Sequence, residues 1–305
     1  MRKYRIYGQI IESDMEFSYL IPADDHSYDE KDIIRIKREV IGDEVNERLE
    51  NTGVNYLVSF EVSCFRNPWG YFLVKYGTDI FYEIKDGAGE KDIIPFILGY
   101  CLSMALLQKK ILAIHCSAVC VPKDYGDGEA LLIVGESGAG KSTLTRKLLD
   151  EGFGFMADDI AAISFDENIY VHPTFPYQKL CRNEIEANDL DKSGMLYIDE
   201  NKDKFLVPVK KHFVNEPQKL KGMIYIVPAM VDNVEVHELS GFDQFMAFKN
   251  NIFMHKMTGE WEKEKGFLDL CLKAAGKCPV YVILRPIGKN TVESMCASIK
   301  NLFLD

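Results

Sequence analysis

The sequence GESGAGKST, residues 135–143, decides the fold. It matches the phosphate-binding pattern G-x-x-x-x-G-K-[ST] at Gly135, Gly140, Lys141 and Ser142. An apolar run, ALLIV, precedes it, and a helix-forming run, STLTRKLLD, continues from it. This order predicts a strand, a loop whose backbone N–H groups cradle phosphates, and a helix whose N-terminus favours anions. A chance match in a glycine-rich turn is the alternative, and the strand–loop–helix context argues against it.

The loop supplies the candidate residues for binding a nucleotide, which are Gly135, Glu136, Ser137, Gly138, Ala139, Gly140, Lys141, Ser142 and Thr143. In a loop of this type the lysine places its ammonium on the β- and γ-phosphates, and the following serine offers its hydroxyl to Mg²⁺. The expected cofactors are therefore ATP or GTP together with Mg²⁺. The Asn-Lys-x-Asp motif of translational GTPases is missing from the sequence. The fragment Leu239-Ser240-Gly241 matches an ABC-type signature poorly and predicts a helix N-cap instead.

Two adjacent aspartates end the apolar run FGFMADD, residues 153–159. A second acidic group is needed to hold Mg²⁺ or to activate a nucleophile, and the apolar runs at 222–227 and 280–284 supply no carboxylate. Side chains alternate along a strand, so one carboxylate would face the site and the other would point away. If the strand ends at the pair, Asp158 and Asp159 can both reach the phosphates. A solvated turn is the alternative interpretation.

The rest of the chain predicts an α/β protein with an N-terminal β-rich region, residues 1–90, and a second domain, residues 91–305. Strands are expected at 5–11, 15–20 and 59–64, and a hairpin at 71–84. A helix is expected at 93–110 and an apolar strand at 111–121. After residue 200, strands are expected at 206–209, 222–227, 234–237 and 280–284, and helices at 242–253 and 262–275. The last helix, 291–303, would begin with a capping box of Asn290 and Glu293.

Composition excludes several classes of protein. The 305 residues carry a net charge of −11, which disfavours binding to nucleic acid. The most apolar stretch, residues 93–107, is too short to span a bilayer, which needs roughly 18–20 residues. The eight cysteines include no CxxC pair, which disfavours a zinc cluster, and they are expected as free thiols. We therefore expect a cytoplasmic protein with no nucleic-acid or membrane partner.

His115, the loop GESGAGKST and the segment MADDIAAIS together resemble the catalytic core of the HPr kinase/phosphorylase family, a relative of phosphoenolpyruvate carboxykinase. The resemblance implies a P-loop core of mixed sheet with flanking helices. It implies Asp158 as the catalytic base, with His115 and Lys141 beside the transferred phosphoryl group. It also implies Asp159 and Ser142 as Mg²⁺ ligands and assembly into a homo-oligomer. For His115, a core histidine is the alternative.

The N-terminal region is more similar to the short leader of HPr-kinase-like proteins found beside peptide-modification enzymes, including the lasso peptide precursor kinases. The segment TFPYQKLCRNEI resembles a stretch of that subgroup, which makes Lys179 and Arg182 candidates for binding the substrate. The resemblance implies a kinase that phosphorylates a serine of a peptide or protein, including a ribosomally made peptide precursor. The longer interval between His115 and the loop departs from the bacterial HPr kinases.

Two other functions remain open at this stage. A kinase for a small-molecule hydroxyl would use the same core with a different acceptor pocket. A nucleotide-gated binding protein would use the N-terminal region to hold a peptide by strand addition and would catalyse nothing.

Overall fold

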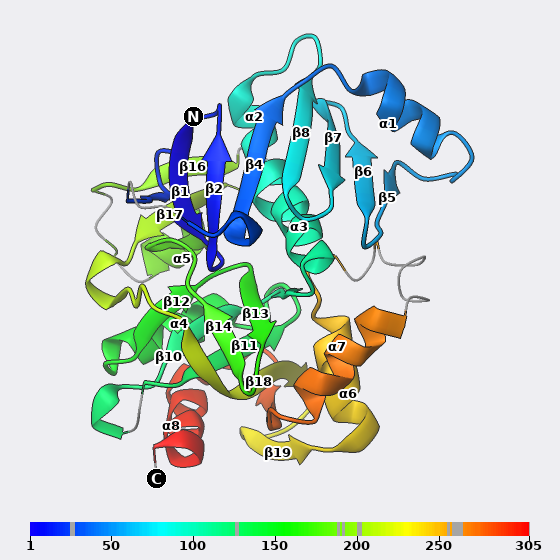
Figure 1. The fold of residues 1–305 in the computed structure, drawn as a ribbon. Coiled ribbons are helices and arrows are strands. Elements are labelled where there is room, and N and C mark those ends of the chain that lie inside the picture. The colour runs from blue at the N-terminus through cyan, green and yellow to red at the C-terminus, as the bar shows by residue number, and fades with distance from the viewer. Residues whose placement is uncertain are drawn as a thin grey trace. The chain divides into compact units, whose positions relative to one another are not determined.

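The protein is a mixed α/β protein with three β-sheets and flanking helices (Figure 1). The computed structural model describes residues 1–24, 28–125, 128–187, 190, 193–199, 203–254, 257 and 265–304. The chain forms two compact units. The first unit comprises Met1–Ala113, Ala162–Ser164 and Ile252–Leu272. The second unit comprises Ile114–Ala161, Phe165–Asn251 and Lys273–Asp305. The predicted α/β class is confirmed, and the domain boundary after residue 90 stays a prediction.

The strands are β1 (Arg2–Ile6), β2 (Gln9–Ser13), β3 (Ile21–Pro22), β4 (Ile33–Arg38), β5 (Tyr56–Leu57), β6 (Val62–Arg66), β7 (Gly70–Lys75), β8 (Asp79–Ile84), β9 (Leu112–Ile114), β10 (Ser117–Cys120), β11 (Ala130–Gly135), β12 (Gly154–Ala157), β13 (Ala161–Phe165), β14 (Ile169–His172), β15 (Tyr177–Cys181), β16 (Leu196–Asp199), β17 (Lys204–Pro208), β18 (Gln218–Ala229), β19 (Glu235–Leu239) and β20 (Val280–Pro286). The helices are α1 (Gly42–Leu49), α2 (Glu90–Phe96), α3 (Leu102–Gln108), α4 (Lys141–Asp150), α5 (Arg182–Ala187), α6 (Gly241–Asn250), α7 (Lys265–Ala275) and α8 (Val292–Phe303), with short 3₁₀ or π segments η1 (Glu30–Asp32), η2 (Ile97–Cys101), η3 (Lys123–Tyr125) and η4 (Lys210–His212).

The first unit is built on an eight-stranded sheet with the order β3-β1-β2-β4-β8-β7-β6-β5. The predicted hairpin is confirmed, since β7 and β8 pair antiparallel. The single strand expected at 5–11 is wrong: the chain turns at Tyr7, which has a φ of 58°, and forms β1 and β2. The strand expected at 15–20 is also wrong. Its apolar side chains are buried without strand pairing, and Phe17 N–H donates instead to the Tyr4 hydroxyl at 3.0 Å.

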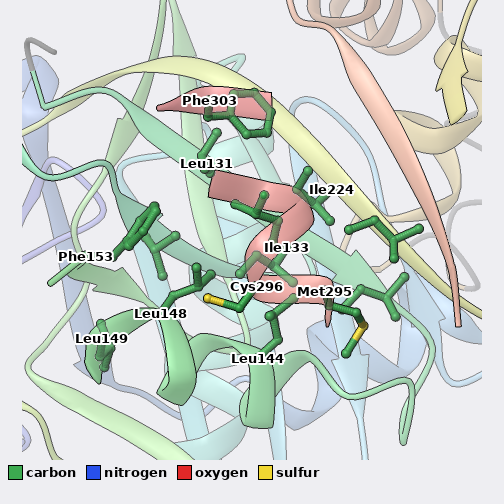
Figure 2. Close-up of a cluster of buried hydrophobic side chains, with 14 of the residues drawn as sticks. Leu131, Ile133, Leu144, Leu148, Leu149, Phe153, Ile224, Met295, Cys296 and Phe303 are labelled. Atoms are coloured by element: carbon green, nitrogen blue, oxygen red, sulfur yellow. The ribbon is translucent and has the colours of Figure 1, made fainter. Parts of the chain in front are cut away.

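The core of the second unit holds the phosphate loop in place. α4 directs Leu144 and Leu148, four residues apart, toward β11, and α8 adds Met295, Ile299 and Phe303 from its own apolar stripe. Figure 2 shows Leu144, Leu148, Met295 and Phe303 among the side chains of this cluster. All of them are almost fully buried. Because α4 begins at Lys141, directly after the loop, packing of α4 fixes the end of the loop.

The strand directions bring several strand ends to one edge. In the second unit β10 lies between β12 and β11 and runs antiparallel to both, so β11 and β12 run in the same direction. β18 is parallel to β11, and β20 is parallel to β18. The carboxyl ends of all four strands therefore share an edge, which is where ligands bind in open α/β sheets. Gly135 ends β11 and Asp158 follows β12 at this edge.

The expected capping box at α8 is not formed. Thr291 is the N-cap residue, while the Asn290 side chain accepts a hydrogen bond from Val292 N–H at 3.3 Å. Glu293 pairs instead with Lys147 on α4 at 3.0 Å. Among the described residues, no helix is long and apolar enough to cross a membrane.

Candidate functional site

The loop of residues 135–140 is shaped by three glycines with positive φ: Gly135, Gly138 and Gly140, at 146°, 80° and 107°. At Gly135 a Cβ atom would lie 2.6 Å from the Ile226 carbonyl oxygen, so only glycine allows this approach of β11 to β18. The Lys141 ammonium lies on the loop itself, at 2.7 Å from the Gly135 carbonyl oxygen. The predicted strand–loop–helix context is present, with an anion-favouring helix N-terminus at its centre.

Arg285 braces this loop from β20. Its Nε donates to the Ala139 carbonyl oxygen at 2.7 Å, and its Nη2 donates to the Gly138 carbonyl oxygen at 3.2 Å. The arginine is the last residue but one of a strand whose carboxyl end lies at the same edge as the loop. Sequence reasoning passed over it because only carboxylates were sought at that strand end.

Both predicted aspartates lie beyond the end of β12, which stops at Ala157. Asp159 has a φ of 69°, a left-handed conformation that aspartate tolerates better than most residues. The alternation of a strand therefore does not apply, and both carboxylates reach Lys179. Asp158 Oδ2 accepts from the Lys179 backbone N–H at 2.8 Å, and Asp159 Oδ2 lies 2.8 Å from the Lys179 Nζ.

A serine completes this group of side chains. Ser117, fully buried on β10, donates its hydroxyl hydrogen bond to Asp158 Oδ1 at 2.6 Å. We name Ser117, Asp158, Asp159 and Lys179 the carboxylate corner. His115 stands beside it, with Nδ1 3.7 Å from Asp159 Oδ1. Ser117 lies two residues after His115 in an apolar run, where a serine alone does not indicate a site.

One strand ties the carboxylate corner to the phosphate loop. The buried Gln178 side chain donates from Nε2 to the Ser142 carbonyl oxygen, in the first turn of α4, at 3.1 Å. The next residue, Lys179, is the one that donates its N–H to Asp158. Two consecutive residues of β15 therefore hold the start of α4 and the Asp158 carboxylate in fixed relation.

The titratable groups of the site differ in the direction in which the protein shifts their pKa. Burial raises the pKa of Asp158 to about 6, against the opposing hydrogen bonds from Ser117 and Lys179. Burial also acts to raise the pKa of Asp159, but the Lys179 ammonium outweighs it and the net pKa lies below its ordinary value. Burial lowers the pKa of His115. At neutral pH the two carboxylates are therefore ionised and the imidazole is neutral.

The cationic side chains of Lys141, Lys204 and Arg182 lie outside the carboxylate corner. Burial lowers the pKa of Lys141, while the charges of Asp158 and Asp159 act to raise it, so the lysine lies within electrostatic reach of both carboxylates. Lys204, on β17, also acts on Asp159 by its charge and was missed at the sequence level. Arg182 forms an ion pair with Asp203, with Nε 2.6 Å from the carboxylate, and its exposed guanidinium lies over the Phe205 ring. Its assignment to the substrate stays a prediction.

The oxygen atoms at this edge suit Mg²⁺. This ion prefers hard oxygen ligands and is usually held by one or two carboxylates together with substrate phosphates. Asp158, Asp159 and the Ser142 hydroxyl provide groups of that kind. Within the described ranges, no group of three or more His, Cys, Asp or Glu side chains could hold a metal ion. A magnesium ion here would therefore take most of its ligands from a triphosphate and from water.

The chain was compared with family models, curated proteins and solved structures. No family model and no curated protein matches this chain. Among solved structures, the chain is similar to the Hpr(Ser) kinase/phosphatase from Coxiella burnetii, with 16% sequence identity and a TM-score of 0.32, over 62% of this chain and 89% of that chain. A TM-score this low carries no inference about activity or substrate, so the function of the site is inferred from the residues of this chain.

Proposed function

We propose that the protein is a Mg²⁺-dependent kinase that transfers the γ-phosphoryl group of ATP or GTP to a serine hydroxyl of a peptide or protein. One observation carries the proposal. The half-buried Asp158 carboxylate is fixed to the first turn of the phosphate-loop helix through Gln178 and Lys179. A carboxylate held at this place can accept the proton of a hydroxyl acceptor beside the phosphates. The motif resemblance of His115, the loop and the aspartate pair to HPr kinases supports the same reaction.

In the proposed reaction Asp158 accepts the proton of the serine hydroxyl. The serine oxygen forms a bond to the γ-phosphorus, and the bond from that phosphorus to the β,γ-bridging oxygen breaks. The products are a phosphoserine, a nucleoside diphosphate and a protonated Asp158, which returns its proton to water. Such transfer depends on positioning and charge neutralisation more than on covalent chemistry.

The other residues act on charge and orientation. The loop N–H groups and Lys141 would bind the β- and γ-phosphates. Asp159 and Ser142 would hold Mg²⁺, which neutralises the charge of the triphosphate when it is bound. Lys179 keeps Asp159 ionised through their 2.8 Å ion pair. The neutral His115 would lie beside the phosphoryl group. A peptide acceptor, including a ribosomally made precursor, is the class that the resemblance favours.

The test is transfer of labelled γ-phosphate onto a panel of serine-containing peptides and small hydroxyl compounds, with and without Mg²⁺. Wild type, Lys141→Ala and Asp158→Asn are compared, with Asp166→Asn, an exposed aspartate of the same unit, as the control. Transfer to a peptide that needs Mg²⁺, Lys141 and Asp158 is the expected result. Transfer only to a small molecule would replace the peptide acceptor with a metabolite. Nucleotide binding without any transfer would overturn the proposal.

A further inference from the structure

A cavity of about 470 Å³ is lined by the C-terminal half of α4, the end of β17 and the short helix η4, and we name it the basic cavity. Arg146 and Asp150 line it from α4, and Lys210, Lys211 and His212 line it from η4. None of these residues belongs to the phosphate loop or to the carboxylate corner. Three permanent cations face one carboxylate here, so the lining is positive although the whole chain carries a net charge of −11.

The protein itself does not neutralise these cations. Among the described residues, the half-buried Arg146 guanidinium forms no hydrogen bond and no ion pair, and the same holds for the ammonium groups of Lys210 and Lys211. Burial lowers the pKa of Arg146, and the charge of Asp150 only partly opposes this. Lys147, the next residue of the same helix, pairs with two glutamates instead. A half-buried cation without a partner is unfavourable, and an anionic ligand would relieve it.

The short helix η4 is anchored at both ends. Before it, Val209 N–H donates to the Pro176 carbonyl oxygen at 2.9 Å. After it, Val214 N–H donates to the Phe155 carbonyl oxygen of β12 at 2.8 Å. The cations of η4 therefore stand on a fixed backbone, and binding a ligand costs less conformational freedom than it would on a free loop.

The lining favours an acidic polypeptide segment over a small anion. Sites for small molecules usually enclose most of their ligand, whereas all three side chains of η4 are exposed. The guanidinium of Arg146 has the fork geometry that binds a carboxylate through two hydrogen bonds. Leu190 and Pro208 add apolar wall, which offers contact to an apolar side chain between acidic ones. An extended segment with acidic side chains around an apolar one matches these groups.

The basic cavity lies along the phosphate-loop helix, at the end away from the loop. α4 has 10 residues, of which Lys141 is the first and Asp150 the last, and this length corresponds to about 15 Å. An extended chain covers about 3.3 Å per residue. A peptide with its acidic segment in the cavity could therefore place a serine at the phosphate loop when about four or more residues separate the two.

We propose that the basic cavity is a docking site for an acidic segment of the polypeptide acceptor, about four or more residues away from the serine that is phosphorylated. The proposal rests on the proposed function, because it takes the acceptor to be a peptide or protein with its serine at the phosphate loop. It assigns selection of the acceptor to Arg146, Lys210 and Lys211, away from the residues that move the phosphoryl group.

The test measures the Kd of three fluorescein-labelled peptides by fluorescence anisotropy. Each carries one serine and, about six residues away, a leucine flanked by glutamates, by glutamines or by lysines. Wild type is compared with Arg146→Gln and with a variant that combines Lys210→Glu and Lys211→Glu. The control combines Lys123→Glu and Lys219→Glu, two exposed lysines of the same unit outside the cavity, so its net charge changes equally. Thermal melting checks that each variant is folded.

Wild type should bind the glutamate peptide about tenfold more tightly than the glutamine peptide. Arg146→Gln should lose most of this difference, and the variant with two glutamates on η4 should prefer the lysine peptide. The control should behave as wild type does. In phosphate transfer, both cavity variants should raise the KM of the glutamate peptide and leave the ATP Kd unchanged.

Equal affinity of wild type for the glutamate and glutamine peptides would overturn the docking site. An equal loss in the control would also overturn it, because the effect would then come from overall charge. Displacement of the glutamate peptide by inorganic phosphate at constant ionic strength would replace the polypeptide with a small anion. If binding depends on the glutamates and on Arg146 but no peptide is phosphorylated, the acidic-segment site stands and the proposed function fails.

Discussion

The phosphate loop and the two aspartates of the carboxylate corner lie at one edge of one sheet, but the loop and the corner are built in opposite ways. The loop is six consecutive residues, 135–140, whose shape comes from glycine backbone conformations. The carboxylate corner takes Ser117 from β10, Asp158 and Asp159 from the turn after β12, and Lys179 from β15. The loop can therefore be recognised from a short sequence motif. The carboxylate corner forms only after the strands have paired, so no short motif reveals it. We therefore predict that the loop binds the phosphates of the nucleotide and that Asp158 of the corner acts on the acceptor.

The largest effect should come from Asp158→Asn. Asparagine keeps the size of the side chain but cannot take a proton, so phosphate transfer should fall by about 10²–10⁴-fold. ATP affinity should stay close to that of wild type, since the loop does not use this carboxylate. Transfer rate and ATP Kd are measured on the same preparation, with Asp166→Asn as control. A large loss of ATP affinity would break the division between the two regions.

Lys141→Ala, unlike Asp158→Asn, should weaken ATP binding as well as slow phosphate transfer. Hydrogen bonds to charged groups are worth about 1.5–3 kcal/mol, so ATP binding should weaken roughly tenfold to a hundredfold. The matched control is Lys147→Ala, on the same helix, whose ammonium pairs with Glu151 and Glu293 outside the loop. Calorimetric titration with MgATP measures both variants. Equal affinities in the two would show that the loop lysine does not contact phosphate.

Gly135→Ala tests whether the loop depends on its backbone. The added Cβ would lie 2.6 Å from the Ile226 carbonyl oxygen, at a φ of 146°. We expect a loss of about 1–3 kcal/mol in the free energy of unfolding, together with weaker ATP binding. Gly152→Ala is the control, since Gly152 also has positive φ but no atom within 4 Å of the added Cβ. Chemical denaturation should show a smaller loss there. Equal losses would mean that the approach to β18 is unimportant.

The same contrast explains what could be predicted from the sequence. The loop and the hairpin of β7 and β8 follow from local patterns and are confirmed. The strand expected at 111–121 is divided into β9 and β10, and the bend at His115 and Cys116 has no turn residue to announce it. β4, with the sequence IIRIKR, was missed because charged residues interrupt its apolar run.

The residues of the site divide in the same way, into those with a local sequence signal and those without one. Asp158 and Asp159 were found because they are adjacent and end an apolar run. Ser117, Gln178 and Arg285 were not, because each acts through a contact with a residue distant in sequence. The geometry of Asp159 could not be predicted either, since its positive φ depends on the contacts that hold the turn.

The central claim is that Asp158 works as an ionised base whose pKa is set by burial and by Ser117. A loss of activity in Asp158→Asn would also follow from a structural role, whereas the pH dependence of transfer follows the titration of the group itself. The direct measurement is therefore the pH profile of single-turnover phosphate transfer for wild type and Ser117→Ala.

Burial raises the pKa of Asp158 to about 6, so the wild-type rate should fall as the pH drops through about 6 and the base becomes protonated. Ser117 acts to lower that pKa. Its removal should move the acid limb upward by about one pH unit, since a hydrogen bond to a charged group is worth about 1.5–3 kcal/mol and one unit corresponds to about 1.4 kcal/mol. An acid limb that keeps its position in Ser117→Ala, or a wild-type rate that is flat across this range, would contradict the assignment of Asp158 as the base.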